Sequence, residues 1–167
     1  MKKDYRHAAL IVIIVVALDQ ISKWVVAATV ALGAKHTIIP GVLYFTHHLN
    51  DGMAWGLFAG ERMFFIIVTI IALALFTYLA KDLDFTRMRM FSVGLALIIG
   101  GALGNFIDRL YSGLVVDFIG FVPLDVISQW LSNRLFPAFN IADMALVFGM
   151  IFFAIDTLLL EPRRKRG

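Results

Sequence analysis

The sequence has no cysteine among its 167 residues, and charged residues make up only 16% of it. Without cysteine the chain cannot form disulfides, bind zinc or iron–sulfur clusters through thiolates, or use a thiolate nucleophile. A soluble domain usually carries about 25% charged and 45–50% apolar residues, whereas this chain is 60% hydrophobic. The composition argues against a disordered chain, an ordinary soluble enzyme and a nucleic-acid-binding domain. The length suits one domain, residues 1–167.

Several common functional motifs are also missing. The sequence contains no glycine-rich phosphate-binding loop, no G-x-S-x-G and no H-E-x-x-H. His47 and His48 are adjacent on a predicted strand, so their side chains point to opposite faces of it. Further ligands that could complete a metal site with either histidine cannot be placed. We therefore expect no cofactor, no metal site and no nucleic-acid partner.

Apolar stretches long enough to cross a bilayer are abundant. A membrane-spanning helix needs about 20 largely apolar residues. Two stretches, 63–80 and 90–107, carry no charge, and two more, about 8–32 and 141–160, contain only a few polar residues. We predict an all-α membrane protein with four membrane-spanning helices, at about residues 8–32, 63–80, 90–111 and 141–160.

Basic residues gather on one side of the predicted spans. Ten of the 15 lie in the amino terminus, in the loop between the second and third spans, and in the carboxyl-terminal tail. Three lie in the two opposite segments, 33–62 and 112–140. Because lysine and arginine favour the cytoplasmic side, we expect both termini in the cytoplasm. The net charge of +3 then reflects membrane topology, not a nucleic-acid partner.

The two outer segments have different patterns. Residues 42–49 (VLYFTHHL) are aromatic and β-branched and lie between clusters of turn residues, which predicts a small hairpin or curved sheet. Within 112–140, apolar residues recur at helical spacing between polar ones and include Trp130. That spacing predicts a short amphipathic helix in the membrane interface. A loop helix packed on the bundle fits the same pattern.

Asp19 and Lys23 are ionisable residues inside the first span. Their spacing of four places them on one helix face, where they can form a structural ion pair. Lys23 beside Ser22 also raises the possibility of a Ser/Lys catalytic dyad. Adjacent helical residues point about 100° apart, so a different serine would have to serve.

The third span ends in a polar face. Gly100 and Gly104 form a GxxxG pattern, which indicates close helix packing. Asn105, Asp108 and Arg109 follow at spacings that place them together at the outer end of that helix.

Two further aspartates are expected at the same membrane level. Asp117 lies among apolar residues just beyond the third span, and Asp143 shares a face with Asn140 where the fourth span begins. Two carboxyl groups in a partly dry site cannot both ionise easily, so the pair can supply a general base and a general acid around one water. Such aspartates also serve proton-coupled transport, and Asp108 or Asp143 could instead cap a helix or pair with Arg109.

Five blocks of the sequence resemble the lipoprotein signal peptidases, also called signal peptidase II, and occur in the order found in that family. They are DQISK (19–23), NDGMAWG (50–56), GGALGNFIDR (100–109), VVDF (115–118) and FPAFNIAD (136–143). The resemblance covers nearly the whole chain. One difference is that Met53 follows Gly52, where the family usually has a small residue.

The resemblance implies an aspartic endopeptidase of the bacterial cytoplasmic membrane. Such enzymes remove the signal peptide from diacylglyceryl-modified prolipoproteins by cutting before the lipidated cysteine, at the outer face of the membrane. The resemblance also implies an extracytoplasmic β-cradle and a short outer helix. Asp117 and Asp143 match the catalytic aspartates. The polar positions that support the site are matched by Asp19, Lys23, Asn50, Gly52, Asn105, Asp108, Arg109 and Asn140.

Our hypothesis is that the two aspartates share a proton and activate water. Side chains that would then hold the substrate backbone or the developing oxyanion are Asn50, Asn105, Arg109 and Asn140. The expected partners are the prolipoprotein substrate and membrane lipid, and nothing in the sequence calls for more than a monomer. The alternatives are a Ser/Lys membrane peptidase and a small proton-coupled transporter.

Overall fold

The computed structural model describes residues 5–52 and 60–164 and contains the four predicted spans. They are α1 (Tyr5–Thr29), α2 (Arg62–Leu79), α3 (Arg89–Tyr111) and α5 (Ile141–Ile155). Helix α2 continues into the short helix η2 (Ala80–Asp82), and α5 continues through η3 (Asp156–Leu160) into α6 (Glu161–Arg164). Helix α1 ends at Thr29 and not at residue 32, because the chain turns at Gly33, whose φ is +77° and whose N–H donates to the His47 carbonyl.

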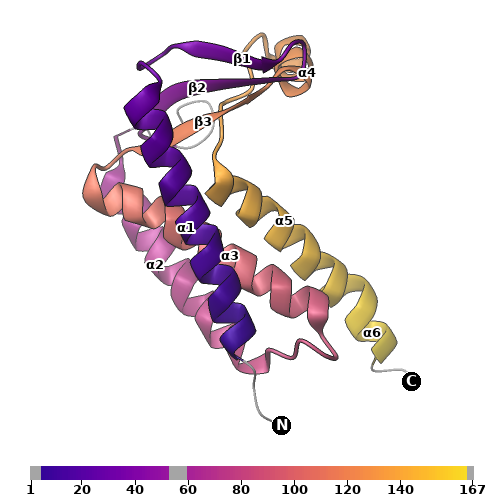
Figure 1. The fold of residues 1–167 in the computed structure, drawn as a ribbon. Coiled ribbons are helices and arrows are strands. Elements are labelled where there is room, and N and C mark those ends of the chain that lie inside the picture. The colour runs from indigo at the N-terminus through magenta and orange to yellow at the C-terminus, as the bar shows by residue number, and fades with distance from the viewer. Residues whose placement is uncertain (1–4, 53–59, 165–167) are drawn as a thin grey trace.

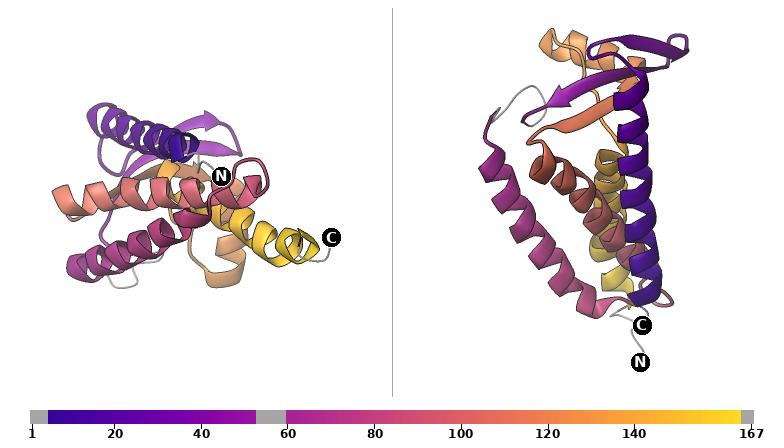
Figure 2. Two further views of the ribbon diagram at one scale, coloured as in Figure 1. Left: turned by 90° about the horizontal axis from the view of Figure 1, so that it is seen from below. Right: turned by 60° about the vertical axis from the view of Figure 1, so that its left-hand side comes forward.

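Helix α3 contacts each of the other three spans, and the two ends of the chain lie at the end of the molecule opposite the sheet (Figures 1 and 2). Glycines permit the close approach. A Cβ at Gly94 would lie 2.8 Å from the Gly149 carbonyl oxygen of α5, and one at Gly100 would lie 2.9 Å from the Val15 Cβ of α1. The packing role predicted for the GxxxG pattern is confirmed at Gly100. Inside a bilayer the lipid is as apolar as a neighbouring helix, so hydrophobic burial does not drive helices together. Small residues instead let the helix backbones approach closely and gain packing contacts.

A three-stranded antiparallel sheet lies above the helices (Figure 1). Its strands are β1 (Lys35–Ile39), β2 (Leu43–Asn50) and β3 (Val115–Phe121), in that spatial order. The predicted hairpin is confirmed as β1–β2. Strand β3 was not predicted as a strand. It is largely buried on both faces, so its sequence lacks the alternation of apolar and polar residues that marks a half-exposed strand.

Helix α4 (Val122–Ser132) follows β3 and confirms the predicted amphipathic helix. Its polar residues Asp125 and Ser128 face inward and are buried, while Trp130 is 83% exposed. An apolar outer face is typical of a helix in a membrane interface. The Tyr44 hydroxyl donates to the Asp125 carboxylate at 3.0 Å. Burial and that carboxylate raise the pKa of Tyr44 to about 12, so the phenol remains a donor.

Candidate active site

Lys23 is the centre of a buried group of charges between α1 and α3. Its Nζ lies 2.8 Å from an Asp19 oxygen and 2.9 Å from an Asp108 oxygen. Gln20 donates to Asp108 at 2.9 Å and to Asp19 at 3.2 Å. We call Asp19, Gln20, Lys23 and Asp108 the ion cluster. The predicted pairing of Asp19 with Lys23 is confirmed, and Asp108 pairs with Lys23 and not with Arg109.

Asp19 also attaches α1 to the first turn of α5. Its second carboxylate oxygen accepts a hydrogen bond from the Ala142 N–H at 2.9 Å. A carboxylate is favoured at the amino end of a helix because the free N–H groups there carry partial positive charge. Gly104 makes the space, since a Cβ there would lie 2.6 Å from Asp19 Oδ2. The ion cluster therefore holds α1, α3 and α5 together at the sheet end of the bundle.

Asp143 lies at the third position of α5 and is half-buried. Its N–H donates to the Asn140 side chain at 2.9 Å, and its carboxylate accepts the Asn140 N–H at 3.1 Å, which forms a reciprocal cap. The possibility that Asp143 caps a helix is thus confirmed. The other carboxylate oxygen accepts a hydrogen bond from the Asn105 amide at 2.7 Å.

Asp117 is 2% exposed and projects from β3. One carboxyl oxygen accepts from the Asn140 amide at 2.7 Å and the other from the Asn50 amide at 2.8 Å. Burial, followed by the negative charge of Asp143, raises the pKa of Asp117 to about 7, although both amide donors act in the opposite direction. We call Asp117 and Asp143 the carboxylate pair.

Asn105 connects the ion cluster to the carboxylate pair. Its Oδ1 accepts hydrogen bonds from Lys23 Nζ at 2.9 Å and from Asn140 at 3.1 Å. Its Nδ2 donates to Asp143. A rigid chain of hydrogen bonds therefore runs from the charges of α1 to both carboxyl groups.

The carboxylate pair lines one pocket of about 370 Å³. Arg109 also lines it, and its guanidinium lies 4.7 Å from the centre of the Phe65 ring. In the part of the chain that the structure describes, no hydrogen bond or ion pair of Arg109 is found. The rest of the pocket wall comes from Asn50, Gly52, Phe65, Asn105, Phe136, Pro137, Ala138, Phe139 and Leu146.

Sequence reasoning placed these polar residues in one site but did not find how they are joined. Three of the four residues assigned to substrate, namely Asn50, Asn105 and Asn140, hold the aspartates through their amides. Gly52 donates its N–H to Asn50 Oδ1 at 2.9 Å and so orients that amide, whereas Met53 lies outside the described residues.

Gln20 and Phe65 were missed. Gln20 could have been found, because a polar residue within a membrane span is unusual. The sequence does not distinguish Phe65 from the other phenylalanines of the spans.

The contacts of Lys23 also bear on the Ser/Lys alternative. Its partners within the described residues are Asp19, Asn105 and Asp108, and none is a serine. In the same part of the chain, no three His, Asp or Glu side chains gather in a way that would hold a metal ion.

Comparison with known proteins gives consistent matches. Residues 11–159 match the family model described as signal peptidase (SPase) II. Proteins named lipoprotein signal peptidase from Listeria monocytogenes serotype 4a and Listeria innocua serovar 6a are 39% identical to this chain, over 95% of it and 96% of their own length. Two solved bacterial membrane enzymes, also 39% identical, superpose with TM-scores of 0.79 and 0.77. They match 91% and 92% of this chain and 87% and 93% of their own.

Proposed function

The chain belongs to the signal peptidase II family, and from that membership we propose an aspartic endopeptidase that removes the signal peptide of diacylglyceryl-modified prolipoproteins. Asp117 and Asp143 are its reacting residues, and the cut falls before the lipidated cysteine. One observation carries the catalytic assignment: both aspartates line one pocket and both bond to the single residue Asn140, whose side-chain amide donates to Asp117 and whose backbone N–H donates to Asp143.

The electrostatics of the carboxylate pair support acid–base catalysis. The hydrogen bonds recorded for the pair come from amides and backbone N–H groups, not from a cation. Two negative charges this close, without a cation bonded to either, retain one proton between them at neutral pH. A pair with one proton contains both an ionised carboxylate and a carboxylic acid, as peptide hydrolysis requires.

The proposed reaction uses both members of the pair. The ionised carboxylate takes a proton from a water molecule while the water oxygen bonds to the scissile carbonyl carbon, and the carboxylic acid gives its proton to the carbonyl oxygen. The C–N bond of the tetrahedral intermediate then breaks as its nitrogen is protonated by the carboxyl group that took the proton from water. A hydroxyl of the intermediate returns its proton to the other carboxylate as the carbonyl of the new carboxylic acid forms, which restores the starting state of the pair. Arg109 lines the same pocket, and its guanidinium would polarise the scissile carbonyl or hold a neighbouring carbonyl of the substrate.

The arrangement of the chain supports a location for this reaction. The two ends of the chain lie at the end of the bundle opposite the sheet (Figure 1), and most basic residues fall in segments at that end. Because basic residues favour the cytoplasmic side, we place both termini in the cytoplasm. The carboxylate pair then lies at the outer face of the bacterial cytoplasmic membrane. A diacylglyceryl chain can remain in the bilayer there while the peptide enters the pocket of a monomeric enzyme.

Cleavage of a diacylglyceryl-modified prolipoprotein by the purified protein in detergent tests this function. Mass spectrometry should find a product that begins at the lipidated cysteine, and the unmodified prolipoprotein should be cut far more slowly. Asp143→Asn is the inactive control. Proton flux in liposomes without any cleavage would instead support the transporter alternative and would overturn the peptidase.

A further inference from the structure

A second pocket of about 590 Å³ lies beside the first, along the sheet. The two pockets share Asn50, Asp117 and the segment 136–138 as walls. The first pocket is otherwise lined mainly by α2, α3 and α5, and the second by β1, β2 and the chain after α4. A peptide that passes Asp117 can therefore have one side of the scissile bond in each pocket.

The second pocket is a groove with a defined direction. Tyr44, Thr46, His48 and Asn50 are alternate residues of β2, and they line it together with Leu49. Asp117 on β3 lies directly opposite His48. Tyr44 lies opposite Gly120, three residues from Asp117 along β3. At about 3.3 Å per residue, the groove therefore extends from Asp117 toward Tyr44 over the length of about three or four residues of an extended peptide.

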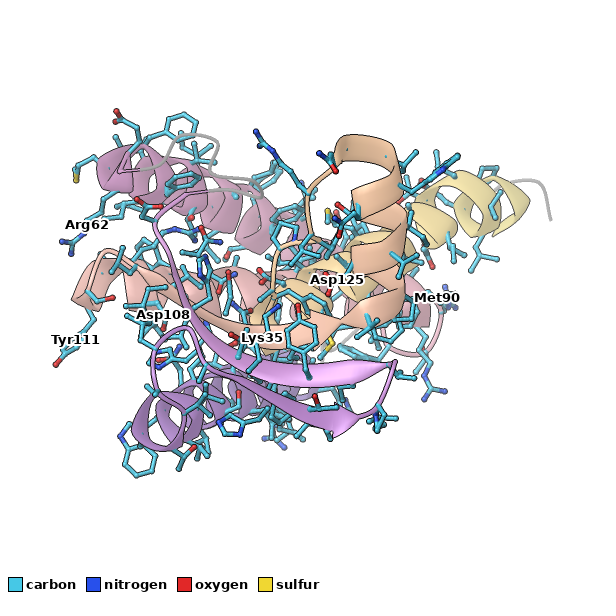
Figure 3. The ribbon with its side chains drawn as sticks, turned by 90° about the horizontal axis from the view of Figure 1, so that it is seen from above. Lys35, Arg62, Met90, Asp108, Tyr111 and Asp125 are labelled. Carbon is cyan, nitrogen blue, oxygen red and sulfur yellow. The ribbon has the colours of Figure 1, made fainter. Side chains whose placement is uncertain are left out.

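Positive charge marks the far end of this groove. Lys35 on β1 lies opposite Thr46, and its Nζ is 4.8 Å from the centre of the Tyr44 ring. Arg134, two residues beyond α4, lines the same groove, and both side chains are exposed. Neither cation forms a salt bridge within the described residues. Figure 3, in which the molecule is seen from above, shows Lys35 at the sheet.

Negative charge lies at the near end. Asp51 lines the groove next to Asn50, close to the carboxylate pair. The groove therefore changes from acidic beside the scissile bond to basic about two residues away. An extended peptide with an acidic side chain at its far end matches this distribution, and a basic side chain at the same place opposes it.

We propose that this groove binds the first residues of the mature chain, and that Lys35 and Arg134 favour an acidic side chain at the second or third of them, the lipidated cysteine being the first. The inference rests on the proposed function. The signal-peptide side occupies the pocket between the helices, where Phe65 and Leu146 are apolar walls. The mature side, which must leave the membrane, follows β2.

Two modified prolipoproteins that differ only in having Asp or Lys at both the second and the third mature residue provide the test. The wild-type protein should cleave the Asp substrate with a kcat/KM about threefold to fivefold higher, the range of an exposed pair of opposite charges. The difference should lie in KM, because the contact is the same in the bound substrate and the transition state. It should shrink as salt is raised.

The double variant Lys35→Gln/Arg134→Gln should cleave both substrates equally. Lys81→Gln is the matched control, because it removes a cation from the opposite end of the bundle and should leave the preference unchanged. Equal cleavage of the two substrates by the wild type would overturn the inference and leave the proposed function standing. A preference that persists in the double variant would overturn the assignment to these two residues. Cleavage of neither substrate would overturn the proposed function and the inference with it.

Discussion

The ion cluster and the carboxylate pair each contain two aspartates, yet they are built on opposite principles. In the ion cluster, Lys23 bonds to both carboxylates, so each negative charge has a bonded cation, which the two share. In the carboxylate pair, the bonded side chains are the amides of Asn50, Asn105 and Asn140. A cation fixes the ionised state of its partners, whereas an amide can hold a carboxyl group without settling its charge.

This difference separates a structural role from a reactive one. Asp19 is fully buried and lines neither of the two pockets described above. Its carboxylate oxygens bond to Lys23, to Gln20 and to a backbone N–H of α5. Asp117 and Asp143 open into a pocket large enough for a peptide group and water. Two aspartates near a bilayer are therefore informative only with their partners, because the same residue type bonds to a cation in one place and only to amides and backbone N–H groups in the other.

The largest effect is expected from removing the charge of the reactive pair. Asp117→Asn and Asp143→Asn should each lower the cleavage rate by about 10⁴-fold, the upper end of what a positioned acid or base contributes, while the protein still folds. Initial rates and the thermal unfolding midpoint in detergent check this. Asp19→Asn is the matched comparison and should instead lower the unfolding midpoint. More than about one-hundredth of wild-type activity in either pair variant would contradict the assignment.

A loss of stability is expected when the cation of the ion cluster is removed. Lys23→Met leaves Asp19 and Asp108 buried without their cation, and breaking a buried ion pair in this way costs about 3–5 kcal/mol. The unfolding midpoint should fall sharply. The double variant Lys23→Met/Asp108→Asn should recover part of the loss, since it removes one of the uncompensated charges. A midpoint unchanged by Lys23→Met would show that the cluster contributes nothing to the fold.

Asn105 tests whether the two groups act independently. Asn105→Leu keeps the side chain's approximate size but removes a partner from Lys23 and another from Asp143. A hydrogen bond to a charged group contributes about 1.5–3 kcal/mol, so stability and cleavage rate should both fall, the rate by roughly tenfold or more. Tyr111→Phe, near the end of the same helix and 92% exposed, should change stability by no more than about 0.5 kcal/mol. A loss confined to one property would mean that the groups are uncoupled.

The helical parts of this molecule were predictable because their signals are local. Apolar length defines a span, and the helical repeat places Asp19 and Lys23 on one face. Strand β3 was missed because its evidence is distant: Val115–Phe121 is a strand through pairing with β2, about 70 residues earlier in the sequence. Burial of both its faces left no alternation to read.

The site was predictable as a set of residues but not as a set of bonds. Asp117 and Asp143 were identified as a pair from their expected level in the membrane. That Asn140 bonds to both, and that Asn105 bonds to Lys23, depends on how three helices and a strand meet. Arg109 was expected on one face with Asp108. It lies instead over Phe65 of α2, which is possible because consecutive helical residues diverge by about 100°.

The last expected effect is a dependence on pH that the carboxylate pair should show because no cation bonds to it. The pKa of Asp117 is raised to about 7, so its acid form is present below that pH and is lost above it. Once both carboxyl groups are ionised no acid remains, and kcat/KM should fall about tenfold per pH unit, or about 1.4 kcal/mol per unit.

The free energy of unfolding should also decrease as the pH rises. The folded protein keeps this proton between about pH 4 and 7, where the unfolded chain has lost it, so the unfolding free energy should decrease across that window and level off above it. Asp117→Asn should abolish this contribution to the slope, as unfolding midpoints at several pH values would reveal. A cleavage rate that rises from pH 7 to 9 would mean that the carboxylate pair reacts with both members ionised. The absence of a bonded cation would then not be what distinguishes this pair from the ion cluster.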